Sequence, residues 1–253
     1  MCVSAQDERF TRWLAQLETR HLADFRVAEV TRALRALSSA YVQRRQKLAA
    51  GAALSSAGKR AAFALFYGPL HLLTVAHIVR AVGGGSPAPT HIVDLGCGTG
   101  VAAAAWALCA DKTSTILGID RHPWAVDESR RTYRDLNLHG HARVGDLKRL
   151  PALASSGAAV AAYTLNELTD AHRRAVEMQL LEAAARGTRL LIVEPIARAV
   201  TPWWNDTAAR IKGLGGREDD WRIPVDLPPL LRLLDKSAGL RHQELTARSL
   251  YIG

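Results

Sequence analysis

Residues 91–100 read HIVDLGCGTG and combine three local signals in a short space. The apolar start, residues 91–95, predicts a buried strand. The glycines at 96, 98 and 100 predict a tight turn in which a ligand can lie against bare main chain. Residues 101–110 are rich in alanine and predict a helix whose first N–H groups face that ligand. The stretch therefore predicts a strand, a glycine turn and a helix that bind a nucleotide-type ligand.

Two kinds of nucleotide cofactor use such a turn. A dinucleotide site requires the pattern G-x-G-x-x-G. Counted from Gly96, Val101 stands where that pattern needs glycine or alanine, whereas counted from Gly98, Ala103 fits. Asp94 precedes the glycines, and a carboxylate there suits a ligand with an ammonium and a sulfonium better than a pyrophosphate. The run DLGCGTG resembles motif I of class I S-adenosylmethionine (SAM)-dependent methyltransferases, with a NAD-dependent oxidoreductase as the alternative.

The rest of the chain continues the alternation of strands and helices. A helix begins near Pro123, which suits a first helical turn. Strands are expected at residues 114–120, 142–147, 158–163 and 189–194. This order predicts an α/β fold with a parallel sheet covered by helices on both faces. The resemblance implies the Rossmann-like seven-stranded sheet of class I methyltransferases, closed by an antiparallel hairpin that we expect around 243–245 and 249–252.

Polar side chains follow the predicted strand ends, where parallel sheets bind ligands. We expect Asp94 to address the methionine ammonium, Asp120 the ribose hydroxyls and Asp146 the adenine amino group. The alternative for each acid is a helix cap. The predicted cofactor-binding residues come from the glycine turn and these strand ends: Asp94, Gly96, Cys97, Gly98, Thr99, Gly100, Asp120, Arg121, Asp146, Leu147 and Thr164.

Predicted catalytic and acceptor residues lie after the fourth and fifth strands. Asn166 and Glu167 follow the fourth strand, and Glu167 is either a general base or a residue that shapes its loop. Tryptophan and arginine side chains beyond the fifth strand can stack a flat ring, or the tryptophans can simply cover the sheet edge. The predicted acceptor-contacting residues are Tyr67, Glu194, Trp203, Trp204, Arg217 and Trp221.

The amino-terminal third is basic and helical in pattern. Residues 1–90 hold twelve Lys/Arg against five Asp/Glu, within a chain of net charge +9. We divide the chain into a helical region at 1–82, a Gly/Pro-rich linker at 83–90 and a SAM-dependent methyltransferase domain at 91–253. The helical region is an RNA-binding face, a solvated face of an arginine-rich protein, or a lid in which Phe63, Phe66 and Tyr67 shape the acceptor pocket. His71 is expected to be a packing or surface residue.

A narrower resemblance follows from the order of short motifs. Gly68-Pro69, DLGCGTG, the run AYTLNEL at 162–168 and IVEP at 192–195 resemble the methyltransferase family associated with the mitochondrial small ribosomal subunit and its bacterial relatives. The chain departs from that family because no cysteine follows Cys109. The resemblance implies methylation of RNA, with ribosomal RNA as the acceptor and the small ribosomal subunit as the partner. The alternatives are a small aromatic or amine metabolite as acceptor and a SAM-binding factor without catalytic activity.

Composition limits the remaining possibilities. With 48% hydrophobic and 23% charged residues in 253, the chain can bury a substantial core. It has no run of eighteen apolar residues, and residues 1–10 have no signal-peptide pattern, so we expect a cytoplasmic protein with no membrane partner. The three cysteines have no C-x-x-C spacing, and no metal site is predicted.

Overall fold

The computed structural model describes residues 7–43 and 54–253. The glycine-turn unit has the predicted form. Strand β1 (His91–Leu95) is buried over its last four residues and leads into α6 (Val101–Cys109) through a turn in which Gly96, Gly98 and Gly100 all have positive φ. The strand, turn and helix predicted from residues 91–110 are therefore confirmed.

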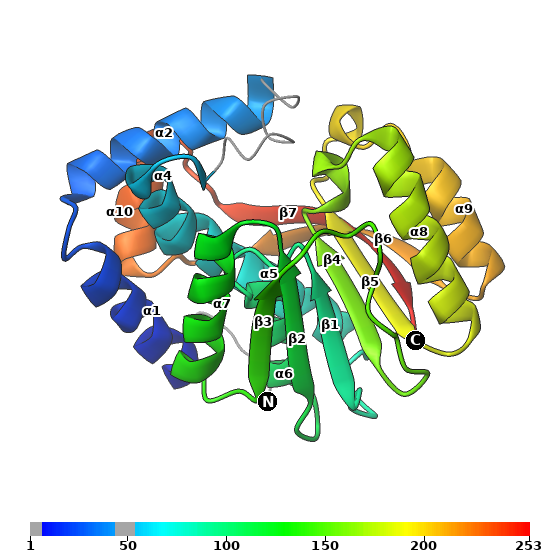
Figure 1. Ribbon diagram of the computed structural model, residues 1–253. Coiled ribbons are helices and arrows are strands. Elements are labelled where there is room, and N and C mark those ends of the chain that lie inside the picture. The colour runs from blue at the N-terminus through cyan, green and yellow to red at the C-terminus, as the bar shows by residue number, and fades with distance from the viewer. Residues whose placement is uncertain (1–6, 44–53) are drawn as a thin grey trace.

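One mixed sheet of seven strands forms the centre of the molecule, in the order β3-β2-β1-β4-β5-β7-β6 (Figure 1). The parallel strands that join β1 are β2 (Thr115–Asp120), β3 (Gly140–Val144), β4 (Ala158–Ala162) and β5 (Arg189–Glu194). Strand β7 (Glu244–Ile252) runs antiparallel between β5 and β6 (Arg217–Pro224). This is the class I methyltransferase fold, as predicted.

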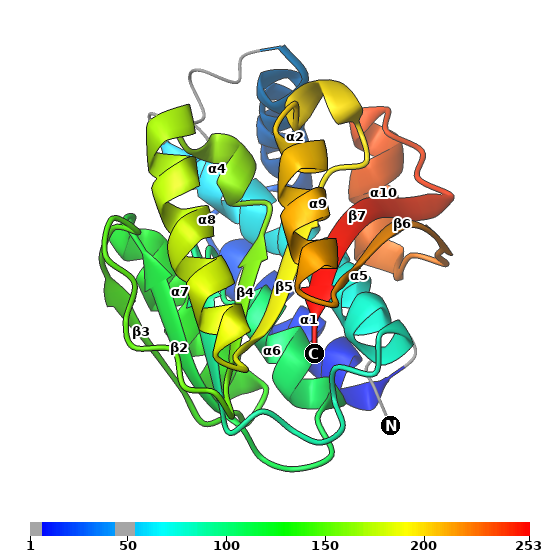
Figure 2. The ribbon, with the colours of Figure 1, turned by 90° about the vertical axis from the view of Figure 1, so that its right-hand side faces the viewer.

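Helices cover both faces of the sheet (Figure 2). One face packs against α5 (Gly68–Ala81), α6 and α7 (Pro123–Asp135), and the other against α8 (Asp170–Ala185) and α9 (Trp204–Gly213). Neighbouring strand residues alternate between the two cores: Ile92 belongs to the first and Val93 to the second. This alternation follows from the two-residue period of a strand.

The amino-terminal helices pack onto the first of these cores. They are α1 (Glu8–His21), α2 (Val27–Gln43) and α4 (Ala57–Ala62), and α4 continues through the π-helical turn η2 (Phe63–Tyr67) into α5. Their buried side chains share one hydrophobic cluster with α6, and α10 (Pro229–Ala238) packs against α2. Helices α2 and α4 lie above the carboxyl ends of the parallel strands (Figure 1). These helices therefore cover the edge of the sheet where ligands bind.

The helical stretch Ala57–Ala81 is long and apolar enough to cross a membrane, judged by length and composition. However, 78% of its most apolar window is buried inside the protein. That degree of burial is typical of a core helix.

Two predicted strands differ from the structure. Strand β3 covers 140–144 rather than 142–147, because its pairing with β2 ends at Asp120, where the N–H of Gly145 makes the last hydrogen bond at 2.9 Å. The predicted terminal hairpin is wrong: residues 244–252 form one long strand, and its antiparallel partners are β5 and β6. Strand β6 begins with four charged residues at the sheet edge, and its apolar alternation is confined to Trp221 and Ile223, which is too short a pattern to identify the strand.

Candidate active site

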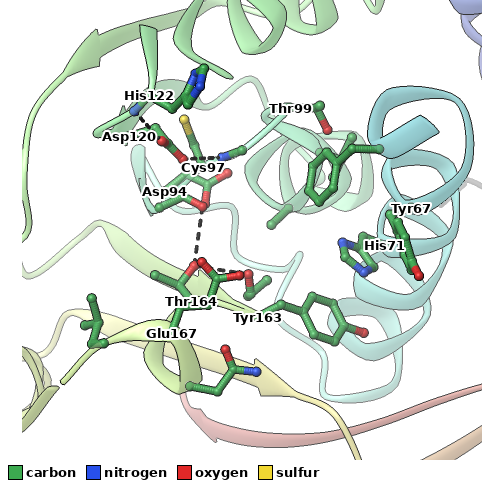
Figure 3. A pocket seen from close by; sticks show the side chains of 18 of the residues that line it. Tyr67, His71, Asp94, Cys97, Thr99, Asp120, His122, Tyr163, Thr164 and Glu167 are labelled. Carbon is green, nitrogen blue, oxygen red and sulfur yellow. Dashed lines mark hydrogen bonds between the residues drawn. The ribbon is translucent and has the colours of Figure 1, made fainter. Parts of the chain in front are cut away.

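A cavity of about 770 Å³ opens at the carboxyl edge of the parallel strands. We call its two parts the cofactor half and the acceptor half. The cofactor half is lined by the glycine turn and the ends of β2 and β3, and the acceptor half by five ring-bearing side chains: Phe63, Tyr67, His71, Tyr163 and His242. Figure 3 shows Asp94, Asp120 and His122 on one side of this space and Tyr67 and His71 on the other. The volume lies within the range of sites for small molecules, roughly 300–1,000 Å³.

The glycine turn is held against the end of β4. A Cβ atom on Gly96 (φ +66°) would lie 2.5 Å from Cγ2 of Thr164, so no larger residue fits there. The hydroxyl of Thr164 donates to the main-chain oxygens of Gly96 (3.3 Å) and Ala162 (3.2 Å). Thr164, predicted as a cofactor contact, lines the cavity and also braces the turn.

Asp94 lies at the end of β1 with only 1% of its surface exposed. Its Oδ2 accepts a hydrogen bond from the main-chain N–H of Ala103 at 3.0 Å, which fixes the start of α6. Burial, together with the nearby charge of Asp120, raises the pKa of Asp94 to about 7. A cationic ligand in the cofactor half would favour the ionised form of this carboxyl.

Asp120 organises the turn from the end of β2. Its Oδ2 accepts from the N–H of Gly98 at 2.9 Å, and its Oδ1 accepts from the N–H of His122 at 2.8 Å. Each carboxylate oxygen has a second lone pair, so Asp120 can still accept from a ribose diol. Asp146 lies in the loop after β3, with Leu147 beside it on the cavity wall. The acids predicted from the strand ends therefore converge on one cavity.

The turn residues fit SAM in polarity and shape. Thr99 is 2% exposed, and its hydroxyl has no hydrogen-bond partner within the described part of the chain, although it lies on the cavity. A buried unpaired hydroxyl at this place indicates a polar ligand atom. Burial and the neighbouring carboxylates of Asp94 and Asp120 raise the pKa of the Cys97 thiol, so Cys97 is a packing residue of the turn and not a nucleophile.

The predicted catalytic residues lie in the short helix η3 (Leu165–Glu167), directly after β4. Asn166 and Glu167 both line the cavity. Burial raises the pKa of Glu167 to about 7, with Arg121 acting to lower it and Asp120 to raise it. A carboxyl with a pKa near neutrality can accept a proton during a reaction at physiological pH.

Five of the six predicted acceptor contacts lie away from the cavity. Glu194 is fully buried and accepts from the N–H of Asn166 at 3.1 Å, so it positions the η3 loop. Trp203 packs beneath Arg173, and Trp204 donates to Glu218 at 2.7 Å and packs beneath Arg248. These tryptophans cover the sheet, which was the alternative interpretation.

The other two residues that were wrongly predicted to contact the acceptor lie on β6. Arg217 is exposed and paired with Asp219, and the indole of Trp221 donates to Ser249 at 2.8 Å. Both were predicted from their position after the fifth strand, but the chain there forms α9 and an edge strand instead of a loop over the site. Of the predicted acceptor contacts, Tyr67 lines the cavity.

Several cavity residues were not predicted as site residues. His71 was expected to be a packing or surface residue, yet it lines the cavity together with Tyr163 and His242. The signal for His71 was present, because Phe63, Tyr67, His71 and Thr74 recur at spacings of four, four and three and therefore share one helix face. No local pattern pointed to His242, which reaches the cavity from the loop before β7.

The comparisons with known proteins agree with this site. Residues 92–187 match a family described as a methyltransferase domain. The chain carries a SAM-dependent methyltransferase domain. SAM is accordingly its cofactor, and the matched segment contains the glycine turn, Asp120 and the η3 loop. No curated protein matches the chain.

Solved structures resemble the chain at low sequence identity. The magnesium protoporphyrin IX methyltransferase from Synechocystis PCC 6803, solved with bound SAM, is 15% identical and has a TM-score of 0.46, with 72% of this chain and 78% of that one covered. A putative RNA methyltransferase from Pyrococcus horikoshii is 12% identical with a TM-score of 0.45, over 72% and 83%. A SAM-dependent methyltransferase from Aquifex aeolicus is 14% identical with a TM-score of 0.46, over 72% and 90%.

Proposed function

We propose that the domain transfers the methyl group of SAM to a small molecule with a planar ring, bound in the acceptor half of the cavity. The observation that carries this proposal is the composition of that half. Its wall consists of the rings of Phe63, Tyr67, His71 and Tyr163, under the helices α4, η2 and α5. A concave wall of rings suits a flat apolar ligand.

The residues of the cofactor half have separate roles in this proposal. Asp94 and Asp120 hold the charged and hydroxyl groups of SAM, which supplies an activated methyl group when bound. Glu167 takes the proton that a hydroxyl or amine acceptor loses on methylation. The protein accelerates the transfer chiefly by positioning the acceptor next to the methyl group and by excluding water from the acceptor half.

Transfer of labelled methyl from SAM into a fractionated cell lysate tests the proposal. We expect label in small, organic-soluble material, and none with the Asp120→Ala variant. Label confined to large material that ribonuclease destroys would contradict the small-molecule proposal and support RNA as the acceptor. Absence of label in every fraction, with SAM binding intact, would support a factor without catalytic activity.

RNA is the second candidate acceptor, favoured by the outer face of α2. Arg32 is exposed on α2 and Arg26 just before it, and Arg35 of α2 donates to the main-chain oxygen of Ser237, whereas Arg44, Arg45 and Lys47 lie outside the described residues. The resemblance to the family of the mitochondrial small ribosomal subunit points the same way, and a splayed base could use the same ring-lined wall. RNA binding through these arginines predicts an affinity that falls steeply with salt concentration. An affinity for RNA that does not change with salt concentration would contradict RNA binding through these arginines and would favour the helices as a lid over the acceptor half.

A further inference from the structure

The acceptor half contains a continuous row of rings. Phe63 and Tyr67 have ring centroids 6.0 Å apart, and Tyr67 and His71 have centroids 5.9 Å apart. His71 then stacks on Tyr163 at 4.0 Å with an angle of 20° between the ring planes. Figure 3 shows His71 between the two tyrosines. The row joins the lid helices to the end of β4, so it forms one wall from two distant parts of the chain.

This wall carries no net charge near neutral pH. Burial lowers the pKa of His71 to about 3 and raises the pKa of Tyr67 to about 12. Burial also raises the pKa of Tyr163. The rings therefore offer a neutral aromatic surface, which favours a neutral planar ligand.

Backbone strain fixes the end of the wall at Tyr163. Tyr163 has φ +58°, a conformation that is costly for a residue with a bulky side chain. Its main-chain N–H donates to the main-chain oxygen of Val193 at 2.7 Å, so Tyr163 remains hydrogen-bonded to β5 despite its positive φ. The side chain consequently leaves the line of β4 and lies against His71.

A polar pair stands at the rim of the same half. His242 lies in the loop before β7, lines the cavity and has 35% of its side chain exposed. Its Nδ1 lies 2.5 Å from Oδ1 of Asp235, and its main-chain N–H donates to Oδ2 of Asp235 at 2.8 Å. Asp235 belongs to α10 and is 4% exposed.

The two contacts orient the imidazole. A carboxylate accepts from Nδ1–H, so in the neutral ring the lone pair is assigned to Nε2. Phe66 flanks the ring, with centroids 6.0 Å apart. With a neutral ring, the Asp235–His242 pair therefore provides a hydrogen-bond acceptor of fixed orientation next to the aromatic wall.

We infer that the acceptor half is a subsite for hydroxylated arenes, in which the ring lies on the wall of Phe63, Tyr67, His71 and Tyr163 and a hydroxyl donates to Nε2 of His242. The wall selects a flat ring, and the fixed lone pair selects a donor on that ring. This inference names the acceptor class of the proposed function and rests on it. In this arrangement His242 binds a ring hydroxyl other than the group that loses its proton to Glu167, and Asp235 positions His242.

Binding of two matched probes to the full chain with S-adenosylhomocysteine present tests the inference. The probes are 2-naphthol and naphthalene, which share a ring system and differ in the hydroxyl. We expect 2-naphthol to bind about tenfold more tightly than naphthalene, as one hydrogen bond of about 1.4 kcal/mol would give. In His242→Ala this difference disappears. His139→Ala, which changes an exposed histidine away from the cavity, keeps the difference.

Two outcomes would overturn the inference. Equal affinity of the wild-type protein for both probes would show that the hydroxyl forms no hydrogen bond with His242. Failure of both probes to bind would show that the acceptor half is not a subsite for arenes. A SAM titration of the same samples separates these outcomes from failure of the proposed function, because loss of SAM binding is a defect of the cofactor half. His242→Ala leaves the buried carboxylate of Asp235 with the main-chain N–H of His242, so the SAM titration also serves as the check that this variant is folded.

Discussion

Asp120 connects the ligand site to the conformation of the glycine turn. Its two oxygens accept from the N–H groups of Gly98 and His122, so the same carboxylate shapes the turn and faces the cavity. Asp146 differs because 55% of its side chain is exposed and its bonds are local to Lys148. Two acids at strand ends that look equivalent in sequence therefore have unequal roles.

The first prediction concerns the Asp120→Ala variant. We expect SAM affinity to fall by about 10- to 100-fold, as loss of a charge-assisted hydrogen bond worth about 1.5–3 kcal/mol implies. Asp146→Ala is the control and should lower the affinity for SAM by less than about tenfold, because water already solvates this side chain. Calorimetric titration with SAM measures both. An unchanged affinity in Asp120→Ala would refute the ribose assignment.

The second prediction concerns the pH dependence of SAM binding. Because the pKa of Asp94 is raised to about 7, this carboxyl is largely neutral below that pH and ionised above it. A cationic ligand binds the ionised form more tightly, so SAM affinity should rise between pH 6 and pH 8.

Two isosteric variants assign this titration. Asp94→Asn should flatten the pH profile, because its amide oxygen can still accept from the N–H of Ala103 but carries no charge. Glu167→Gln separates the contribution of the other carboxyl whose pKa is raised to about 7. A wild-type affinity that is constant from pH 6 to pH 8 would contradict the role of Asp94.

At the scale of elements, the glycine turn depends on the helix beside it. A Cβ on Gly100 would lie 2.7 Å from Cβ of Ser129 and 2.8 Å from the ring of Tyr133, both on α7. The turn and α7 are thus packed so closely that a side chain at position 100 would require α7 to shift. Gly100 has φ +78°, so it also needs the left-handed conformation.

The third prediction separates the two reasons why position 100 needs a glycine: its positive φ and the lack of space for a side chain. Gly215 has φ +81° but nothing within 4 Å of a built Cβ. Gly215→Ala should therefore cost only the backbone strain, roughly 1–2 kcal/mol. Gly100→Ala adds overpacking and should cost about 3 kcal/mol or more of the free energy of unfolding. Urea denaturation measures both, and equal costs would show that the space around Gly100 adapts.

At the scale of the whole molecule, a buried ionic cluster joins the first helix to the Rossmann-like core. Glu128 of α7 is fully buried and accepts from Arg20 at 2.8 Å, with His21 at 3.0 Å. Arg20 also pairs with Asp135 at 3.0 Å. Burial acts to raise the pKa of Glu128, but the hydrogen bonds and charges of His21 and Arg20 outweigh it and lower that pKa. The amino-terminal helices are therefore attached through charge as well as through the shared hydrophobic cluster.

The fourth prediction concerns Arg20→Met. Removing Arg20 leaves the Glu128 carboxylate with weaker partners, and we expect a loss of roughly 2–3 kcal/mol in the free energy of unfolding at pH 7. Arg134→Met is the control, since Arg134 is 72% exposed and such a change costs about 0.5 kcal/mol at most.

The pH dependence of this loss has a definite sign. A lowered pKa means that the cluster stabilises the fold above the ordinary glutamate pKa of 4.5 and that this stabilisation is lost as the pH falls through the lowered value. The difference between wild type and Arg20→Met should therefore shrink in acid. A difference that grows in acid would contradict the ionic origin of the effect.

The sequence by itself determined the glycine turn, the parallel strands and the acids at their ends. These features depend on contacts between residues close in the chain: a strand period, three glycines that permit positive φ, and carboxylates at strand ends that a parallel sheet brings to one edge. Asp94 and Asp120 could be placed for that reason. The final strands could not, because β6 begins with four charged residues at the sheet edge and only Trp221 and Ile223 carry the alternation of a strand.

Only the tertiary structure decided what faces the acceptor. The wall needs η2 and α5 laid over the end of β4, and the Asp235–His242 pair needs the loop after α10 to turn back onto that helix. The same packing turned Trp203 and Trp204 into the core. The contact between His71 and Tyr163 joins residues far apart in the chain, and its geometry follows from how helices pack on the sheet. Asp235 and His242 are only seven residues apart, but no local pattern predicts the turn that brings them together.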